Sequence, residues 1–414
     1  MEFVRKPQGD GMKHILVVSQ YFYPESFRIN DIAMEWVKRG YHVTVLTGIP
    51  NYPQGEYYNG YSKIERTREK WNGIDIIRLP IEPRKKGSRN LIKNYLSFVC
   101  EGRKWIAKTT VKADVVFTYE VSPMTQALVS VWYSKRNKVP HFLYVTDLWP
   151  QNVEIITGIH NKVFVGSIQL MVDYIYKNSK MILTSSKSFI HEIEKRKIPK
   201  ERIEFWPQYA EDFYYPTKRI NNDEIPHDGK CNLVFAGNIG YAQGLDILPK
   251  AAKTLKKEGI FVRFNIIGDG RYKRDLIQLI ADYGVQEYFN FIDRKPADEI
   301  PPYLAAADVL LITLAKSEVF SITIPAKTQS CLACGKPILV SADGEVQQII
   351  KDAKAGFVSD AEDVIGLVQN INSFLNTDET EKELFGRNAL FYSQTHFNKT
   401  TLLNRIDQLF EGDI

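Results

Sequence analysis

Two short glycine-rich stretches in the second half of the chain have the composition of phosphate-binding turns. They are GNIGYAQG, residues 237–244, and GDGRYKRD, residues 268–275. Each follows an apolar, strand-like run and leads into a segment with helical spacing. Glycine lets the backbone approach a ligand closely, and the N–H groups at the start of a helix attract phosphate. Such turns also use glycine for geometry alone, but two of them in consecutive units favour an anion site.

A third candidate element is EVFSITIPAKTQSCLACGKPILVS, residues 318–341. Pro325 precedes a predicted short helix that starts near Ala326, and Gly335-Lys336-Pro337 ends it. Lys327 then lies in the first turn, where the helix dipole disfavours a cation unless an anion shares the site. An anion is the economical explanation, and an exposed lysine tolerated at a small cost is the alternative.

Several polar residues of the first half follow strand-like runs. Asp147 follows HFLYVT and could orient a bound hydroxyl group, or it could cap the next helix. Glu25, Ser26 and Arg28, in YPESFRIND, are candidates for contacting a bound ligand. Glu120, at the end of ADVVFTYE, is a further acid/base candidate.

The elements that must position these residues alternate between strand and helix. A tight hairpin is predicted at Asn72-Gly73. The predicted strands are KHILVVS, YHVTVLT, ADVVFTY, HFLYVTD and KMILTSS in the first half, and CNLVFAG, FVRFNIIG, EYFNFID, DVLLITL and KPILVS in the second. Alternation of this kind predicts mainly parallel sheets covered on both faces, an α/β fold of two doubly wound, Rossmann-like domains. Such sheets bind ligands at the carboxyl ends of their strands, where the candidate residues lie.

Length and composition agree with two globular domains. The 414 residues are 44% hydrophobic and 25% charged, and the net charge is +5. Four cysteines with a single CxxC predict reduced thiols and no metal site. The longest apolar run, YLAAADVLLITLA, is too short to span a bilayer and contains Asp308.

The order of the three C-terminal elements resembles that of retaining, nucleotide-sugar-dependent glycosyltransferases of the GT-B fold, the large family 4-like group of capsule, O-antigen and lipid-sugar enzymes. QYFYPESFRINDIA, TGIPNYPQG and YVTDLWPQN resemble, more narrowly, the branch that transfers N-acetylfucosamine-like sugars. The resemblance covers Met12 to the C-terminus.

This resemblance implies a UDP-type nucleotide sugar bound by the C-terminal domain and a lipid-linked, polyprenyl-diphosphate saccharide bound by the N-terminal domain, on either side of a central cleft. Glu25, Ser26 and Arg28 would contact the acceptor or the diphosphate, Glu120 would contact the acceptor, and Asp147 would orient an acceptor hydroxyl or the donor sugar. Transfer would retain the anomeric configuration and need no metal or cofactor. The expected division is an N-terminal extension or cloning remnant at 1–11, an acceptor domain at 12–208, a linker at 209–230, a donor domain at 231–380, and C-terminal helices at 381–414 that pack back on the first domain.

The sequence departs from the family at the expected diphosphate contacts. Asn238 and Gln243 replace an Arg and a Lys, and Ile322 and Ser330 replace two Glu. Two amides would stabilise a leaving diphosphate less than two cations, by a few kcal/mol. We expect other cations to compensate, Lys327 first, and assign catalytic roles to Asp147 and Lys327. The expected donor contacts are Asn238, Gly240, Gln243, Gly244, Gly268, Gly270, Arg271, Arg274, Arg294, Gln329 and Ser330.

Residues 84–112 form a basic, amphipathic segment. They hold nine Lys or Arg against one acid, Glu101. The segment suits an anionic membrane surface, with contacts expected from Arg84, Lys85, Lys86, Lys93, Arg103 and Lys104. The alternative is a solvated helix whose apolar side is core. Nucleic acid is not expected, because no base-stacking module accompanies the charge. The predicted location is cytoplasmic, peripheral at the inner face of the cell membrane.

Two other functions remain open. A nucleotide-sugar epimerase of the same architecture would modify the donor without an acceptor. A sugar-nucleotide-binding partner that has lost catalysis would also fit the missing Arg, Lys and Glu residues. A dehydrogenase is poorly supported, because SQYFYPES rather than GxGxxG follows the first strand.

Overall fold

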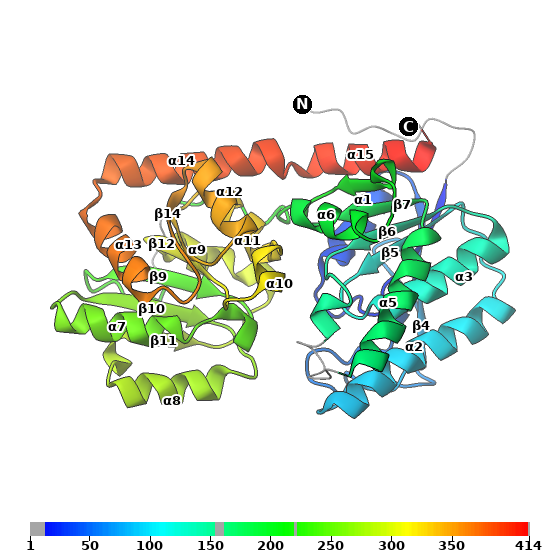
Figure 1. Ribbon diagram of the computed structural model, residues 1–414, viewed down its shortest axis with the longest axis horizontal. Helices are drawn as coiled ribbons and strands as arrows, with labels where there is room; N and C mark the ends of the chain where they lie inside the picture. Colours follow the sequence, from blue (N-terminus) through cyan, green and yellow to red (C-terminus); the bar gives the residue numbers. More distant parts are fainter. Residues whose placement is uncertain (1–12, 154–160, 219–221, 413–414) are drawn as a thin grey trace. The chain divides into compact units, whose positions relative to one another are not determined.

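A computed structural model describes residues 13–153, 161–218 and 222–412 of the chain (Figure 1). It divides into two compact units. Unit 1 comprises Met1–Pro207 and Thr400–Ile414, and unit 2 comprises Gln208–Lys399. The predicted N-terminal extension, residues 1–11, lies outside the described residues.

Unit 1 is built on an eight-stranded sheet in the order β3-β4-β2-β1-β5-β6-β7-β8. All neighbours pair in parallel except β3 and β4, which form the hairpin predicted at Asn72-Gly73. The strands are β1 His14–Val18, β2 His42–Gly48, β3 Arg68–Trp71, β4 Ile74–Leu79, β5 Val115–Glu120, β6 His141–Val145, β7 Met181–Thr184 and β8 Ile203–Phe205. The short edge strand β8 was not predicted.

Helices cover both faces of this sheet. They are α1 Arg28–Lys38, α2 Ser88–Lys108, η1 Met124–Gln126, α3 Ala127–Asn137, α5 Lys162–Lys177, α6 Lys187–Glu194, η2 Lys200–Arg202 and α15 Lys399–Glu411. Phe98 of α2 and Val129 of α3 pack in one core with Val18 and Val116 of the strands. On the other face, Phe410 of α15 contacts the rings of α1, β5 and β6.

Unit 2 contains a six-stranded, wholly parallel sheet in the order β11-β10-β9-β12-β13-β14. Its strands are β9 Cys231–Ala236, β10 Val262–Ile267, β11 Phe289–Ile292, β12 Val309–Thr313, β13 Ile338–Ser341 and β14 Gly356–Ser359. The last of them was missed, because FVS is too short for a periodic signal. Each half therefore has the predicted Rossmann-like α/β architecture.

The helices of unit 2 lie between and after these strands (Figure 1). They are η3 Tyr241–Gln243, α7 Ile247–Lys257, α8 Lys273–Tyr283, η4 Gln286–Tyr288, η5 Ala297–Glu299, α9 Pro301–Ala306, α10 Glu318–Ser321, α11 Ala326–Ala333, α12 Glu345–Ala353, α13 Val364–Asn376 and α14 Glu379–His396. The helices α7, α8 and α13 share a core with the sheet, and α14 packs against α11 and α12. Pro325 caps α11, as predicted.

The C-terminal helices divide differently from the sequence-based expectation. Residues 381–414 were expected to pack together on the first domain, but α14 belongs to unit 2 and only residues from Thr400 onward belong to unit 1. Trp206 explains the return of α15 to unit 1, because its indole N–H donates to the Leu402 carbonyl at 2.8 Å. The expected linker, residues 209–230, is likewise counted within unit 2.

Candidate functional site

The two glycine-rich turns of unit 2 are bonded to each other at the carboxyl ends of β9 and β10. Ile239 N–H donates to the Asp269 carbonyl at 2.8 Å, and Tyr272 N–H donates back to the Ile239 carbonyl at 3.0 Å. A Cβ on Gly268 would lie 1.9 Å from the Gly237 carbonyl oxygen, and one on Gly270 would lie 2.2 Å from that of Ile239. The contact between the turns therefore requires glycine at 268 and 270 whether or not a ligand binds.

Glycine is required at the end of the first turn as well. Gly244 has φ +58°, and a Cβ there would lie 2.7 Å from the Ala315 backbone nitrogen. The Gln243 carbonyl next to it accepts a hydrogen bond from the Thr313 hydroxyl at 2.6 Å. This turn is thus fixed against β12, and it holds the Gln243 side chain in place.

Lys327 joins α11 to the first glycine turn. Its ammonium donates to the Gln243 side-chain oxygen and lies 3.8 Å from the centroid of the Phe235 ring. A Cβ on Gly237 would lie 3.1 Å from the same ammonium. Within the described residues Lys327 has no carboxylate partner, and removal from water lowers its pKa to about 7. Within the described residues, no negatively charged group therefore balances the charge of the Lys327 ammonium.

The pairing of Lys327 with Gln243 gives a physical meaning to one departure from the family pattern. The cation that the sequence resemblance implies at position 243 would bring a second positive charge close to the Lys327 ammonium. The neutral amide instead accepts a hydrogen bond from that ammonium. Asn238, at the other departure, is exposed on the same turn.

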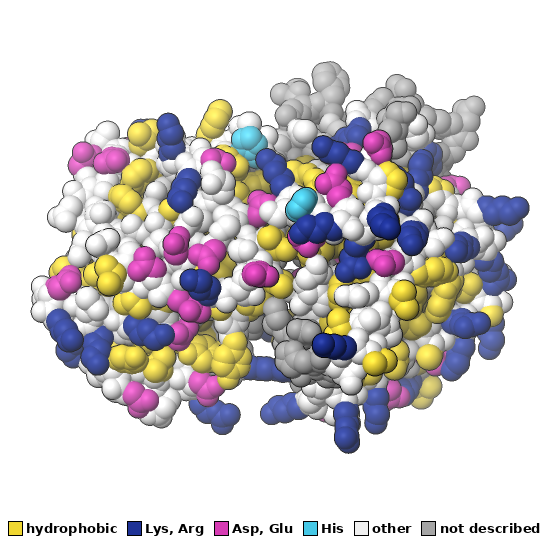
Figure 2. Space-filling model, viewed as in Figure 1, with side chains coloured by type: hydrophobic (Ala, Val, Ile, Leu, Met, Phe, Trp, Pro, Cys, Tyr) yellow, Lys and Arg dark blue, Asp and Glu magenta, His cyan; other side chains and the backbone are white. Residues whose placement is uncertain are grey.

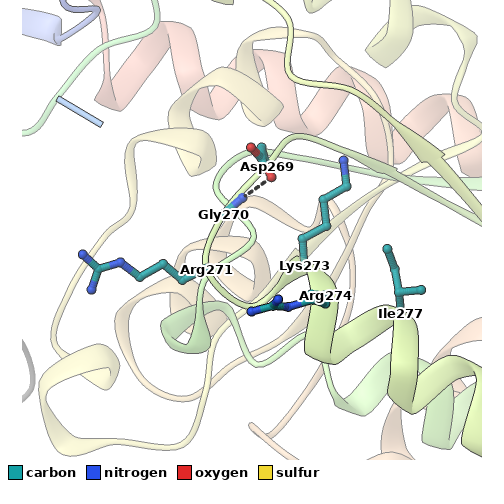
Figure 3. A pocket seen from close by; sticks show the side chains of 6 residues that line it. All are labelled: Asp269, Gly270, Arg271, Lys273, Arg274 and Ile277. Carbon is teal, nitrogen blue, oxygen red and sulfur yellow. Dashed lines mark hydrogen bonds between the residues drawn. The ribbon is translucent and has the colours of Figure 1, made fainter. Parts of the chain in front are cut away.

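Further cations surround the second glycine turn (Figure 3). A cavity of about 440 Å³ is lined by Asp269, Gly270, Arg271, Lys273, Arg274 and Ile277. Arg271 and Arg274 are exposed and have no hydrogen-bond or ion-pair partner in the part of the chain that the structure describes. Lys273, which sequence reasoning missed, reaches Asp293 at 3.2 Å and the Gly268 carbonyl at 3.4 Å. The one sequence feature that could have indicated Lys273 is its position in the first turn of the helix that follows this glycine turn.

The remaining predicted donor residues lie elsewhere in unit 2. Arg294 is exposed beyond the end of β11 and does not line this cavity. Gln329 and Ser330 are buried in α11, where the Gln329 amide nitrogen, in the orientation that satisfies its surroundings, donates to the Pro325 carbonyl at 3.1 Å. The Ser330 hydroxyl turns back to the Ala326 carbonyl at 3.4 Å. Both side chains therefore hydrogen-bond to backbone carbonyls at the start of their own helix.

In unit 1, Glu120 and Asp147 meet at the carboxyl ends of β5 and β6. Glu120 is fully buried and accepts a hydrogen bond from Asp147 N–H at 3.4 Å, while its other oxygen has no partner among the described residues. Burial, and then the negative charge of Asp147, raise the pKa of Glu120 well above its usual range. The Asp147 carboxylate accepts from Ser122 N–H at 2.8 Å. Of the two acids, Asp147 is the partly exposed one.

Glu25 has a different role from the acceptor contact that the sequence suggested. Its buried carboxylate accepts hydrogen bonds from the N–H groups of Asn51 and Tyr52, both at 2.7 Å, and of Phe22 at 3.3 Å. It thereby ties the loop after β1 to the loop after β2, and burial raises its pKa to about 7. Its neighbour Ser26 is exposed, whereas Arg28 is buried.

Each half of the chain matches a known protein-family model. Residues 217–389 match the family model described as glycosyl transferases group 1, and residues 26–208 match the glycosyl transferase 4-like domain. Both halves of the chain are thus glycosyltransferase-family domains. The colanic acid biosynthesis glycosyltransferase WcaL of Escherichia coli K12 is 20% identical over 241 residues, which cover 58% of each chain. The glycosyl transferase WcaI of the same organism is 22% identical over 80% of this chain and 83% of its own.

Solved structures share the fold of these glycosyltransferase-family domains over nearly the whole chain. Sucrose-phosphate synthase from Thermosynechococcus elongatus has a TM-score of 0.74 at 16% identity, with 97% of this chain and 98% of the other covered. Anabaena HepE in complex with UDP and glucose has a TM-score of 0.69 at 16% identity, with 97% and 100% covered. The fold is GT-B. The chain spans 58% and 60% of the length of the first two curated relatives it matches.

One residue of the basic segment, Arg84, is less exposed than a membrane contact requires. Arg84, expected at a membrane, is partly buried: its guanidinium donates to the Tyr21 hydroxyl at 3.3 Å and lies 5.3 Å from the Tyr52 ring centroid. The apolar side of α2 belongs to the core, as the alternative predicted. The other expected membrane contacts, Lys85, Lys86, Lys93, Arg103 and Lys104, are exposed.

Neither domain shows a metal centre or a spanning helix in its described part. Among those residues, no three His, Cys, Asp or Glu side chains gather as a metal site would require. None of the described helices combines the length and the apolar character needed to cross a membrane.

Proposed function

We propose that this protein transfers a sugar from a nucleotide donor to a saccharide acceptor in the assembly of a bacterial surface polysaccharide. The family matches of both units and the named roles of WcaL and WcaI support this activity. The observation that carries it is the Lys327 ammonium, which lies partly buried beside two bonded glycine turns without a negative partner in the described chain.

The proposed donor is a UDP-type sugar bound by unit 2. Its diphosphate would lie beside Lys327 and the cations of the second turn, Arg271, Lys273 and Arg274. When the sugar leaves, negative charge develops on the diphosphate, and fixed cations stabilise that charge. An anion beside Lys327 would also favour its protonated form, so a bound diphosphate would place a negative charge next to this ammonium. The HepE complexes with UDP support a nucleotide at such a fold.

Unit 1 would hold the acceptor, a polyprenyl-diphosphate-linked saccharide. Asp147 is the proposed contact to an acceptor hydroxyl or the donor sugar, because its carboxylate is partly exposed at the end of β6. Glu120 would act through Asp147, since it bonds the Asp147 N–H from a buried position. We further propose an N-acetylfucosamine-like sugar, retention of the anomeric configuration, no metal or other cofactor, and a peripheral place at the inner face of the cell membrane.

A thermal-shift series tests the donor site first. UDP or a UDP-sugar at 100 times its dissociation constant should stabilise the protein by about 2.7 kcal/mol. Lys327→Met should lose most of this shift, and Lys257→Met, at an exposed position of α7, should keep it. No shift with any nucleoside diphosphate or nucleotide sugar would refute a donor site in unit 2.

Turnover then separates the possible reactions. Release of UDP that depends on a polyprenyl-diphosphate saccharide supports transfer. Interconversion of nucleotide sugars without an acceptor would instead show an epimerase, and donor binding with neither reaction would show a binding protein that has lost catalysis.

A further inference from the structure

The helix α5 of unit 1 exposes apolar side chains along one side. Val163, Leu170 and Tyr174 are 83%, 74% and 36% exposed. Their spacing of seven and four residues places them on one side of the helix, opposite the buried Ile168, Val172, Ile175 and Tyr176. We call Val163, Leu170 and Tyr174 the α5 stripe. The helix thus has a second apolar side that the core of unit 1 does not use.

Cations flank this stripe. The helices α2, α3 and α5 together carry nine Lys or Arg and only two acids, Glu101 and Asp173. Both acids are already paired, Glu101 with Lys104 at 2.6 Å and Asp173 with Arg196 at 2.8 Å. The exposed cations are Arg89, Lys93, Arg103, Lys104, Lys108, Lys135, Arg136, Lys162 and Lys177. In the view of Figure 2, hydrophobic side chains gather over the region of α5 and α3, with lysine and arginine side chains around them.

Two consecutive residues of α3 connect the stripe to α2. Lys135 lies 4.8 Å from the Tyr174 ring centroid on α5, and Arg136 donates to the Ile106 carbonyl on α2. Between α2 and α3 lies a cavity of about 390 Å³ lined by Arg103, Ile106, Ala107, Trp132 and Arg136. The Arg103 guanidinium lies 5.6 Å from the Trp132 ring centroid. An open cavity with two guanidinium groups and an indole suits a phosphate attached to an apolar chain.

We propose that the face formed by α2, α3 and α5 docks on an anionic phospholipid surface, with the α5 stripe entering the boundary between headgroups and acyl chains and the Arg103–Arg136 cavity receiving a lipid phosphate. The α5 stripe and the Arg103–Arg136 cavity together favour a lipid surface as the binding partner. A protein partner would explain the stripe, and a soluble anion would explain the cavity, but a lipid surface offers apolar chains beside a dense layer of phosphates. The proposal extends the proposed function, in which the acceptor is lipid-linked, but its binding step does not require transfer.

Vesicle co-sedimentation of the full chain tests this face. Wild type should bind phosphatidylcholine vesicles that contain phosphatidylglycerol, more weakly as salt rises, and should bind pure phosphatidylcholine at least tenfold less. Val163→Ser with Leu170→Ser should weaken binding to the anionic vesicles by about tenfold or more. Ile365→Ser, which removes a 71% exposed side chain from α13 of unit 2, should leave binding unchanged.

A second pair of variants tests the charges. Arg103→Gln with Arg136→Gln should weaken binding by roughly tenfold and reduce its salt dependence. Because Arg136 also bonds Ile106, Lys104→Gln with Lys108→Gln provides a pair without bonds to the core, and it should act in the same direction. Full binding by both charge pairs, or by the stripe pair, would overturn the proposal. So would a wild-type dimer that the stripe pair converts to a monomer.

The UDP-induced thermal shift separates this proposal from the proposed function. The stripe pair and both charge pairs should keep the shift, because their side chains lie in unit 1. Absence of the shift in wild type, with vesicle binding intact, would refute the donor site and leave the docking face standing. A normal UDP-induced shift without vesicle binding would refute the docking face and leave the donor site standing.

Discussion

Replacing Lys327 with methionine should make the ligand-free protein more stable while weakening its hold on the donor. The pKa of Lys327 falls from an ordinary 10.5 to about 7 in the folded protein. That difference corresponds to at most about 5 kcal/mol of folding free energy. The hydrogen bond to Gln243 and the contact with Phe235 offset part of it, and methionine would leave the Gln243 oxygen without its donor, at about 1–3 kcal/mol. We expect a net gain of roughly 1–2 kcal/mol, or a few degrees in Tm.

The stability of the wild-type protein should rise with pH because of Lys327. Since the folded-state pKa lies below the unfolded one, the unfolded chain binds more protons between pH 7 and pH 10.5. The destabilisation by Lys327 is therefore complete below about pH 7 and fades as the pH rises through that window. The stability advantage of Lys327→Met should shrink between pH 7 and pH 9.5, as measured by calorimetry of the ligand-free proteins.

Donor binding should respond in the opposite direction. Loss of one charge-assisted hydrogen bond to a diphosphate, about 1.5–3 kcal/mol, should lower kcat/KM and UDP affinity by roughly 10- to 150-fold. Lys257→Met is the matched control and should change neither quantity. A Lys327→Met protein that is less stable than wild type at pH 7, or that binds UDP as wild type does, would refute the argument from this partly buried cation.

Three further predictions concern the loops that hold the site. Glu25→Gln should destabilise unit 1 by roughly 1–3 kcal/mol in urea unfolding, because an amide cannot accept from all three N–H groups; an unchanged midpoint would mean that the carboxylate does not hold these loops. Glu120→Gln should gain stability relative to wild type as the pH rises from 5 to 8. Because the pKa of Glu120 is raised in the folded protein, this side chain contributes its full stability only below its unfolded pKa near 4.5, and wild type loses that stability as the pH rises. A stability difference that stays constant across this range would contradict the burial argument. Gly268→Ala should separate the two turns and abolish the UDP shift, whereas Gly259→Ala, also at positive φ but with open space around it, should keep the shift; equal shifts in both variants would show that the contact between the turns does not matter for binding.

Much of the fold followed from local pattern. The alternation of apolar strands with helical segments predicted two α/β units, and Asn72-Gly73 predicted the hairpin, because both signals depend on neighbours in the chain. The short strands β8 and β14 were missed, because three or four residues carry no periodic signal and sheet pairing alone makes them strands. The separate placement of α14 and α15 depends on contacts such as that of Trp206 with Leu402, which lie 196 residues apart.

The candidate site was only partly readable in advance. The glycine turns and Lys327 were identified from residue type and position. The partner of Lys327 could not be, because Gln243 lies 84 residues away. Glu25 looked like a ligand contact because a loop carboxylate is usually exposed, but three backbone donors from two loops hold it inside. Arg84 belonged to a basic run by sequence, and aromatic neighbours turned it inward.

The sequence by itself determined the architecture of this protein, the turns that could hold phosphate, and the cation that starts α11. These features depend on residue type and short-range spacing. Only the tertiary structure decided which charged groups are exposed and which are committed to the fold, and on which helix a second apolar side remains open. Exposure and hydrogen bonding depend on how distant segments pack. For that reason Lys327 and the α5 stripe have a physical role to test, whereas Glu25 and Arg84 are accounted for by the loops they hold.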